Sequence, residues 1–228
     1  MHGHKAAQHE EPGVLITHVR LYNAFLAVLF AGRRGSLDAT MAAASGAAPG
    51  DRVLDVGCGP GHFARRLAEI VGPRGEVVGV DPSQPMIDYA RSHAGNAPNC
   101  HFEVAAAQAL GLPDAAFSVV TSTFVVHHIP PEKRAAALEQ MHRVLRPGGR
   151  LLIADVYPTG QMAPRLARLL GRLTLHRAPG PEGHPSVDPF TDTDVRLLAV
   201  PLRELGFSGL EFTEIRPWTR YVTATKNA

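Results

Sequence analysis

The sequence has no apolar run long enough to form a membrane-spanning helix. The longest run, residues 24–31, is far shorter than the ~20 residues that crossing a bilayer requires. Residues 1–11 are polar and rich in histidine, unlike the basic and then apolar pattern of a signal peptide. The formal net charge is +2 over 228 residues, which indicates no broad basic surface for nucleic acid. We therefore expect a cytoplasmic protein without a transmembrane segment or a nucleic-acid partner.

Cysteine and the common metal and nucleophile motifs are also scarce or absent. The two cysteines, Cys58 and Cys100, lie in different contexts, so we expect no disulfide and a reducing compartment. Neither H-E-x-x-H nor C-x-x-C occurs, so we expect no metal site. No G-x-S-x-G elbow of a serine hydrolase is present. The abundance of alanine, glycine, arginine and proline is typical of a GC-rich bacterial genome.

The most informative stretch is residues 53–63, which read V-L-D-V-G-C-G-P-G-H-F. The pattern predicts a buried strand, a tight turn and the start of a helix, with Pro60 in the first helical turn. A helix that begins here would favour a negatively charged group at its amino end. Glycines at alternate positions allow positive φ angles and let a ligand lie against bare backbone. These glycines are Gly57, Gly59 and Gly61.

The glycine spacing differs from that of a dinucleotide-binding turn. That turn reads G-x-G-x-x-G, whereas this one reads G-x-G-x-G and has Asp55 two residues before its first glycine. A second acid, Asp81, follows a strand predicted at residues 76–80. An acid at the carboxyl end of such a strand can accept both hydroxyls of a ribose. Because NAD sites use the same device, Asp81 alone predicts only an adenosine-containing ligand.

Hydrophobic periodicity and turn residues predict the other elements. Ser36 is expected to cap a helix at 37–44, and Thr191 or Thr193 a helix at 195–205 with a kink at Pro201. Further helices are predicted at residues 14–30, 63–71 and 132–144, and further strands at 100–104, within 112–122, within 144–155, at 210–215 and at 218–225.

Residues 161–177 interleave arginine with leucine. Three interpretations stay open for this segment. It can be a lid helix over a substrate, a helix that contacts a membrane surface, or a packed leucine face with a solvated arginine face.

Residues 55–61, Asp81 and the Pro-Gly-Gly turn within residues 144–155 together resemble the class I S-adenosylmethionine (SAM) methyltransferases, whose first motif is D-x-G-x-G-x-G. The resemblance covers roughly residues 50–155. It implies a doubly wound α/β fold with a seven-stranded mixed sheet whose last strand is antiparallel. After a disordered tail at residues 1–12, we expect one domain at 13–228. It would have a helical cap at 13–47 and a lid-like insertion at 157–190.

The resemblance implies that SAM is the cofactor. Asp55 would accept a hydrogen bond, directly or through water, from the methionine amino group, and the backbone at Ser122 or Thr123 would complete that site. Tyr22 would reach the methionine end or simply pack. Met86 would lie on the adenine or in the core. The remaining cofactor-binding candidates are Gly57, Cys58, Gly59, Gly61, Asp81, Pro82, Ala106, Ala107 and Gln108.

Two positions depart from the family pattern. Ala106 stands where the family has the acid that receives the adenine amino group, so backbone, water or Gln108 would take that role. The loss of one such hydrogen bond costs on the order of 1 kcal/mol. Ser118 stands where the fourth strand usually has an acid.

The catalytic candidates are His127, His128 and Asp155. The resemblance places His127 and His128 after the fourth strand and Asp155 at the end of the fifth. A histidine can act as general base for a hydroxyl acceptor, and the same histidines can be purely structural.

The chain most resembles the small-molecule branch with quinone, sterol and natural-product enzymes. We therefore expect transfer of a methyl group to oxygen or carbon of a small, partly apolar acceptor, with peripheral membrane contact as an option. The tetrapeptide (D/N)-P-P-(Y/F) of the amino-methyltransferases that act on bases or glutamine is absent. The alternatives are a non-catalytic SAM-binding protein and an NAD(P)-dependent reductase.

Overall fold

The computed structural model describes residues 19, 33–95, 97–157, 194–216 and 218–228. Three predictions lie outside these residues: the disordered tail, the helix at residues 14–30 with Tyr22, and the insertion apart from Tyr157. The proposed domain limits therefore stay a prediction.

Seven strands form one mixed sheet in the order β3-β2-β1-β4-β5-β7-β6. Strands β1 to β5 pair in parallel, and β7 runs antiparallel to both β5 and β6. The predicted doubly wound fold with an antiparallel last strand is thus confirmed. The strands are β1 (Arg52–Val56), β2 (Glu76–Asp81), β3 (Cys100–Val104), β4 (Phe117–Thr123), β5 (Leu145–Val156), β6 (Phe207–Ile215) and β7 (Thr219–Lys226).

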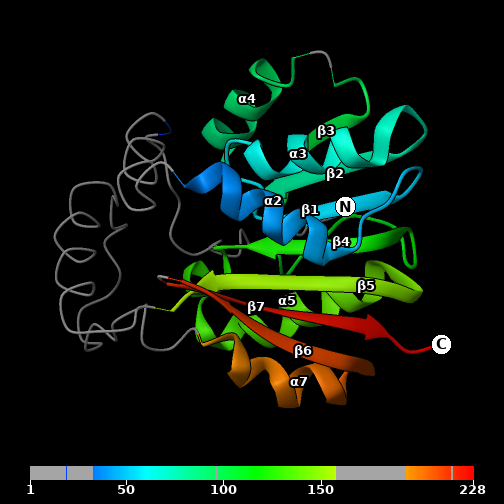
Figure 1. The fold of residues 1–228 in the computed structure, drawn as a ribbon, viewed down its shortest axis with the longest axis vertical. Helices are drawn as coiled ribbons and strands as arrows, with labels where there is room; N and C mark the ends of the chain where they lie inside the picture. Colours follow the sequence, from blue (N-terminus) through cyan, green and yellow to red (C-terminus); the bar gives the residue numbers. More distant parts are fainter. Residues whose placement is uncertain (1–18, 20–32, 96, 158–193, 217) are drawn as a thin grey trace, which may run out of the picture.

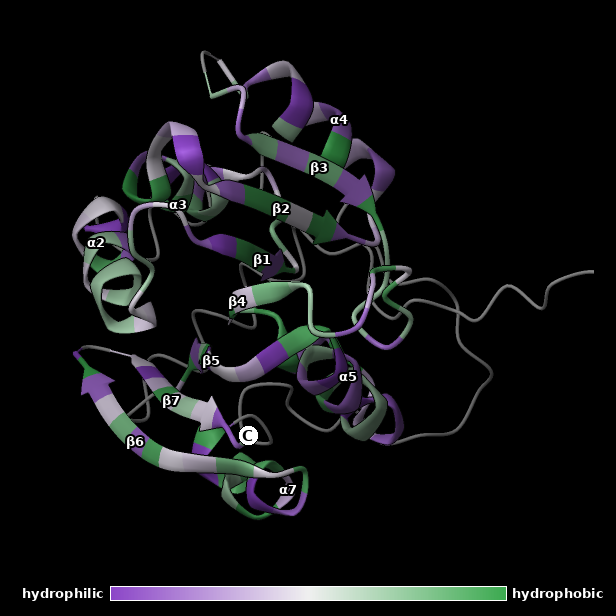
Figure 2. Cartoon of the chain, turned by 90° about the vertical axis from the view of Figure 1, so that its right-hand side faces the viewer, coloured by the Kyte–Doolittle hydropathy of each residue, from purple (hydrophilic) through white to green (hydrophobic). Residues whose placement is uncertain are grey.

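Helices cover both faces of the sheet, as Figure 2 shows. Helices α2, α3 and α4 cover one face, called here the α3 face, and α5, η3 and α7 cover the other, called the α5 face. The helical elements are α2 (Arg34–Ser45), α3 (His62–Val71), η1 (Gly72–Arg74), α4 (Gln84–Ser92), η2 (Val126–His128), α5 (Pro131–Val144), η3 (Val195–Leu198) and α7 (Ala199–Glu204).

Alternation along the strands supplies both cores. On β5, Leu151 and Ile153 pack in the cluster of the α5 face, whereas Leu152 and Ala154 pack in the cluster of the α3 face. The same alternation places Asp55 of β1 on the α3 face, because its strand neighbours Leu54 and Val56 pack in the cluster of the α5 face. Strands buried on both faces are typical of a parallel sheet between two helix layers.

The predicted helix ends were wrong in three places. Helix α2 begins at Arg34 with Arg33 as its N-cap, so Ser36 lies inside the helix and does not cap it. Helix α3 begins at His62, and its N-cap Gly61 has a left-handed backbone conformation. Pro60 therefore precedes the helix. The segment predicted as one kinked helix is a 3-10 turn followed by the short α7.

At that last segment the structure also identifies the cap. The side chain of Asp194 accepts a hydrogen bond of 3.0 Å from the backbone N–H of Arg196. Thr191 and Thr193 lie outside the described residues. Pro201 is the third residue of α7, where its missing N–H removes no intrahelical bond.

Ser118 lies at the amino end of β4, at the opposite end of the strands from the glycine turn. Its hydroxyl is 2.8 Å from Oδ1 of Asp51 and accepts a bond of 3.2 Å from the backbone N–H of Arg52. It therefore fastens β4 to the start of β1. The departure at Ser118 consequently says nothing about cofactor binding.

Candidate functional site

The carboxyl ends of β1 and β4 form the topological switch point of the sheet. From β1 the chain crosses to β2 on one side, whereas β4 leads to β5 on the other. The β1–β4 pairing ends at Asp55 and Thr121, while the β4–β5 pairing continues to Thr123. The backbone of Ser122 and Thr123 therefore extends beyond the β1–β4 pairing on this side. Ligands of open α/β sheets bind at such a point.

The glycine turn leaves β1 at this switch point. Gly57 and Cys58 donate backbone hydrogen bonds of 2.7 and 2.9 Å to the carbonyl of Val80, which ties the turn to β2. All three glycines are left-handed, with φ of 74°, 50° and 76° at Gly57, Gly59 and Gly61.

The three glycines are needed for different reasons. A Cβ at Gly57 would lie 2.2 Å from Cγ2 of Val125, and one at Gly61 would lie 2.7 Å from Cζ of Phe102. These two positions are glycine because the fold packs against them. A Cβ at Gly59 would meet no described atom within 4 Å. Only Gly59 therefore presents bare backbone to open space, as a ligand-binding turn requires.

We expect Gly57→Ala to destabilise the protein by about 2–4 kcal/mol, because it adds the collision with Val125 to the strain of a positive φ. Gly50→Ala is the matched control, since Gly50 has φ of 89° and open space around its Cβ position. Urea unfolding measures both variants, and equal losses in the two would contradict the packing explanation.

Asp55 is a buried carboxylate with one unpaired oxygen. The residue is 1% exposed, and its Oδ1 accepts a hydrogen bond of 2.8 Å from Oγ1 of Thr121. Oδ2 has no hydrogen-bond partner within the described part of the chain. Burial raises the pKa of Asp55 to about 7, although the bond from Thr121 opposes the rise. Such a group fits a cationic donor, which would pair the free oxygen and favour the ionised form.

Asp81 lies at the end of β2 beside the glycine turn. Its Oδ2 accepts a bond of 3.0 Å from the backbone N–H of Gly59, and its Oδ1 accepts one of 2.8 Å from Ser83. Burial raises the pKa of Asp81, and these two backbone bonds oppose the rise. Each oxygen keeps a further lone pair, so the carboxylate can also accept two ribose hydroxyls.

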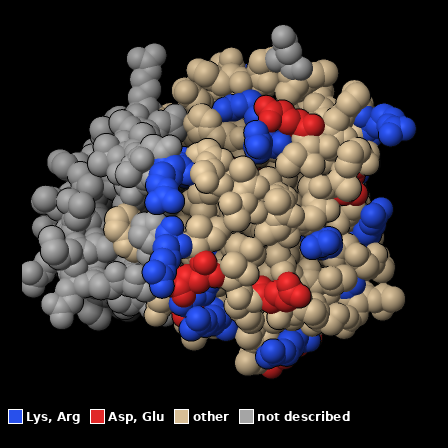
Figure 3. Space-filling model, viewed as in Figure 1, with Lys and Arg blue, Asp and Glu red and all other residues tan. Residues whose placement is uncertain are grey.

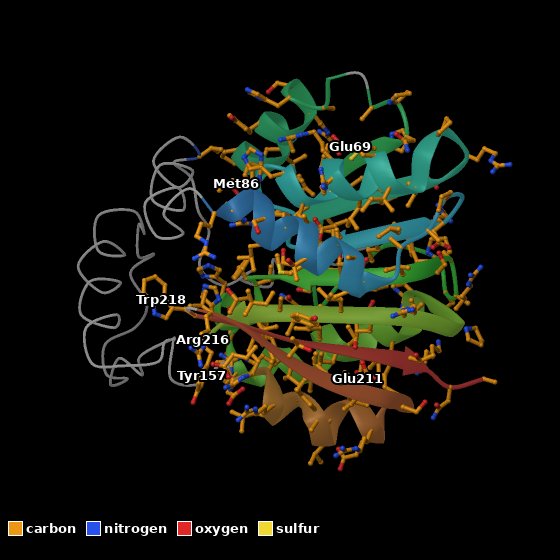
Figure 4. All side chains as sticks on the ribbon, viewed as in Figure 1. Glu69, Met86, Tyr157, Glu211, Arg216 and Trp218 are labelled. Carbon is orange, nitrogen blue, oxygen red and sulfur yellow. The ribbon has the colours of Figure 1, made fainter. Side chains whose placement is uncertain are left out.

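The other predicted adenosine residues gather around Asp81. The backbone N–H of Ala105 donates to the carbonyl of Asp81 at 3.2 Å, which places the loop with Ala106, Ala107 and Gln108 next to it. Met86 is 2% exposed and belongs to neither core cluster of described residues. Figure 4 shows Met86 on the side where the carboxyl ends of the strands lie.

His127 and Asp155 form a hydrogen-bonded pair. Nδ1 of His127 lies 2.6 Å from Oδ1 of Asp155, and the backbone N–H of His127 donates to Oδ2 at 3.0 Å. Oδ1 also accepts from the backbone N–H of Val156 at 2.7 Å. The bond to the carboxylate favours the tautomer with the proton on Nδ1 and none on Nε2. The pair fastens η2 to the end of β5 and fixes the imidazole ring.

The His127–Asp155 pair lies on the opposite face of the sheet from Asp55 and Asp81, the two acids beside the glycine turn. Asp155 alternates with residues of the α3 face and so points to the α5 face. The side chains of His127 and Asp155 are 9% and 0% exposed. The ring of His128 lies 3.9 Å from that of His127, and burial lowers the pKa of His128 well below its usual value. His128 is therefore neutral near pH 7.

Sequence reasoning missed several side chains at this end of the sheet. Arg34 pairs with Asp38 at 2.9 Å and lies 4.9 Å from the ring centroid of Phe124. Arg220 is 3% exposed and bonds to Asp194 at 2.7 Å. Only the i, i+4 spacing of Arg34 and Asp38 could have been read from the sequence. The other contacts join residues far apart in the chain.

Two aromatic side chains border the same end of the sheet. The backbone N–H of Tyr157 donates to the carbonyl of Trp218 at 2.6 Å, and the guanidinium of Arg220 lies 3.8 Å from the centroid of the Tyr157 ring. Figure 4 shows Tyr157 and Trp218 on this side, whereas Glu211 lies away from it.

The described residues also bear on metals, disulfides and membranes. Within them, no three histidine, cysteine or acidic side chains converge on a point that could hold a metal ion. Cys58 and Cys100 are free and buried, in agreement with the prediction of no disulfide. None of the described helices has the length and apolar character to cross a membrane.

Comparison with known proteins places this site in a family context. A family model described as a methyltransferase domain matches residues 53–149, from β1 into the first part of β5. The ubiquinone/menaquinone biosynthesis C-methyltransferase UbiE of Ectopseudomonas mendocina is 41% identical over 128 residues, which are 55% of this chain and 48% of that protein. The chain thus spans about half of that relative's length.

Solved structures show the same fold. A SAM-dependent methyltransferase from Aquifex aeolicus aligns with a TM-score of 0.64 and 21% identity, covering 82% of this chain and 88% of that one. The 4+2 cyclase SpnF aligns with a TM-score of 0.65 and 20% identity, covering 85% and 80% of the two chains. At these identities the likeness concerns the fold, and the cyclase shows that proteins described by different activities share it.

Proposed function

We propose, from the premise that this chain belongs to the class I SAM-dependent methyltransferases, that it transfers a methyl group to a small, partly apolar acceptor. The observation that carries the proposal is the switch point itself. There a buried acid with an unpaired oxygen, an open glycine and a second acid that accepts from the backbone of that glycine lie at the ends of β1 and β2.

The residues at the switch point fit SAM. Oδ2 of Asp55 would accept from the methionine ammonium, and the backbone of Gly59 would lie against the ligand. Asp81 would accept from the ribose hydroxyls. Met86, Pro82 and the loop with Ala106 would border the adenine. When bound, SAM supplies a methyl group that is already activated for displacement.

The protein's share of the reaction is to orient the acceptor, exclude water and take up a proton. Methylation at oxygen or at carbon leaves the acceptor with one proton to lose. The relatives described as C-methyltransferases in quinone biosynthesis favour a carbon of a quinone-like ring as the first acceptor to test. Tyr157 and Trp218 offer aromatic faces against which such a ring would pack.

We infer that Nε2 of His127 takes up the proton that the acceptor loses. Asp155 would orient the imidazole ring for this step. General base catalysis contributes roughly 10²- to 10⁴-fold, so His127→Ala is expected to lower kcat by about 100-fold or more. Its SAM affinity should change less than threefold, because the pair lies on the other face of the sheet. Steady-state kinetics and calorimetry measure the two effects.

The control for this prediction is His101→Ala, since His101 is an exposed residue of β3. His128→Ala is expected to lower kcat less than His127→Ala does, because burial lowers the pKa of His128 well below its usual value and so makes its ring a weak proton acceptor. A fall of less than threefold for both His127→Ala and His128→Ala would reject a histidine base.

The direct test of the function is a transfer assay with methyl-labelled SAM. Reduced quinones with an unsubstituted ring carbon are compared with simple phenols and with lipids, and NMR of the product locates the methyl group. Label on a ring carbon is the expected result. SAM binding without transfer to any acceptor class would instead support the alternative of a non-catalytic SAM-binding protein.

A further inference from the structure

We propose that Arg220 selects the methyl acceptor, because the N–H at its Nε donates a hydrogen bond to an oxygen atom of an uncharged acceptor molecule. This inference rests on the proposed function and deepens it, since it names an atom that the acceptor must carry. Arg220 is the second residue of β7, which begins at the end of the sheet where β5 finishes.

Arg220 lies next to the His127–Asp155 pair. In the antiparallel pairing of β5 with β7, Arg220 is directly opposite Asp155. Residues that are opposite each other in two antiparallel strands point to the same face of the sheet, with Cβ atoms about 4.5–5.5 Å apart. The next such pair, Ile153 and Val222, packs in the cluster of the α5 face. Asp155 and Arg220 therefore point to that face too, and an acceptor that contacts His127 would lie within reach of Arg220.

The guanidinium of Arg220 is buried and uses only part of its hydrogen-bonding capacity. The side chain is 4% exposed. Nη1 donates to Asp194 at 2.7 Å, and Nη2 donates to Glu214 at 3.2 Å. Nε is also buried, and it has no hydrogen-bond partner among the residues that the structure describes. A buried donor without a partner carries a desolvation cost, so this position favours a ligand that offers an acceptor atom.

Three elements hold the guanidinium in place. Asp194 caps η3, Glu214 belongs to β6, and Tyr157 follows β5. The ring centroid of Tyr157 lies 3.8 Å from Cζ of Arg220, a position where an aromatic face favours a cation. The position of Nε is therefore fixed before a ligand binds, which lowers the entropic cost of a directed hydrogen bond.

The charges around Arg220 favour an uncharged acceptor over an anion. Asp194 and Glu214 both pair with the single positive charge of Arg220, and Asp155 lies opposite it on β5. A carboxylate or phosphate ligand would meet this local excess of negative charge, whereas a carbonyl or hydroxyl oxygen would not. Figure 3 shows acidic and basic side chains adjoining on the surface near the turn from β6 to β7.

Arg220→Lys removes the donor and keeps the charge. Lysine has a methylene group at the place of Nε and its ammonium at the place of Cζ, so a cation still lies beside Asp194 and Glu214. Glu214→Gln is the matched control, because it removes one ionic partner and leaves Nε unchanged. If Arg220→Lys does not fold, Arg220→Gln combined with Glu214→Gln takes its place, since that pair of substitutions removes one charge of each sign.

The test compares two bicyclic probes that differ in one oxygen atom. Tetralone carries a ring carbonyl, and tetralin has the same carbon skeleton without it. Ligand-observed NMR measures the binding of each probe to the full chain with S-adenosylhomocysteine added. The wild type and Glu214→Gln are expected to bind tetralone about tenfold more tightly than tetralin, as for a hydrogen bond to a charged group. Arg220→Lys is expected to bind both probes equally, while its affinity for S-adenosylhomocysteine changes less than threefold.

The outcomes separate the role of Arg220 from the proposed function. A wild type that binds S-adenosylhomocysteine but neither probe, or both probes equally, would overturn the role of Arg220 alone. So would an Arg220→Lys variant that keeps the preference for tetralone. Loss of the preference in Glu214→Gln as well would show that only the ion pairs matter, and would also overturn it. A wild type that prefers tetralone but binds neither SAM nor S-adenosylhomocysteine would support the role of Arg220 and overturn the proposed function.

Discussion

Gly59→Ala is expected to abolish SAM binding at ligand concentrations that saturate the wild type, while the protein remains folded. The added methyl group would occupy the open space into which the backbone of Gly59 faces. Its conformational cost is only the strain of alanine at φ of 50°, about 1–2 kcal/mol. Steric exclusion of a ligand from its binding site commonly costs more free energy than such strain. The substitution should therefore weaken SAM binding far more than it lowers the free energy of unfolding.

Gly95→Ala provides a closely matched control. Gly95 also has a positive φ, 59°, and open space around its Cβ position, but it lies in the loop between α4 and β3. Both variants should lose similar stability in thermal unfolding, and only Gly59→Ala should lose binding. Comparable SAM affinity in the two variants would mean that the glycine turn does not hold the ligand.

Asp55→Asn is expected to remove a pH dependence from both stability and binding. An acid whose pKa is raised by folding binds its proton more tightly in the folded state. Stability of the free protein therefore falls as pH rises from about 4, near the unfolded pKa, to about 7, the folded pKa. The shift corresponds to at most about 4 kcal/mol across that window, and the variant should lack this contribution.

Ligand binding should show the opposite dependence on pH. A cationic amino group requires ionised Asp55, so the affinity of the wild type for S-adenosylhomocysteine should fall by up to about tenfold per pH unit below pH 7. At pH 8 the variant should bind about 10- to 100-fold more weakly than the wild type. Calorimetry from pH 6 to pH 8.5 measures both proteins. A wild-type affinity that does not change with pH would contradict a role for Asp55 in binding the ammonium.

Much of the fold could be predicted because its signals are local. The apolar runs on β1 and β2 and the glycine turn each specify their own geometry, and the order of the elements specified the sheet. The predicted Pro-Gly-Gly turn instead lies inside β5, where the pairing with β4 shifts register. Helix ends were predicted less well, since Asp194 and Ser36 are both acceptable caps by residue type. Which of them caps a helix depends on where the chain packs against the sheet.

The site was predicted in part, and for a physical reason. Asp55 and Asp81 lie near the carboxyl ends of β1 and β2. Because these two strands pair in parallel, both acids lie at the same edge of the sheet. The distinction among the three glycines depends on Val125 and Phe102, which come from other strands and loops. The contact of Arg34 with Phe124 likewise joins distant segments. Periodicity in one sequence carries no signal for such pairs.

Calorimetric titration of the full chain with SAM, S-adenosylhomocysteine and NADH most directly tests the central claim that the switch point binds SAM. We expect saturable binding of SAM and S-adenosylhomocysteine with one site per chain, weakened in both Gly59→Ala and Asp55→Asn. NADH should not bind. Binding of NADH alone, or SAM binding that is unaffected by either substitution, would contradict the account.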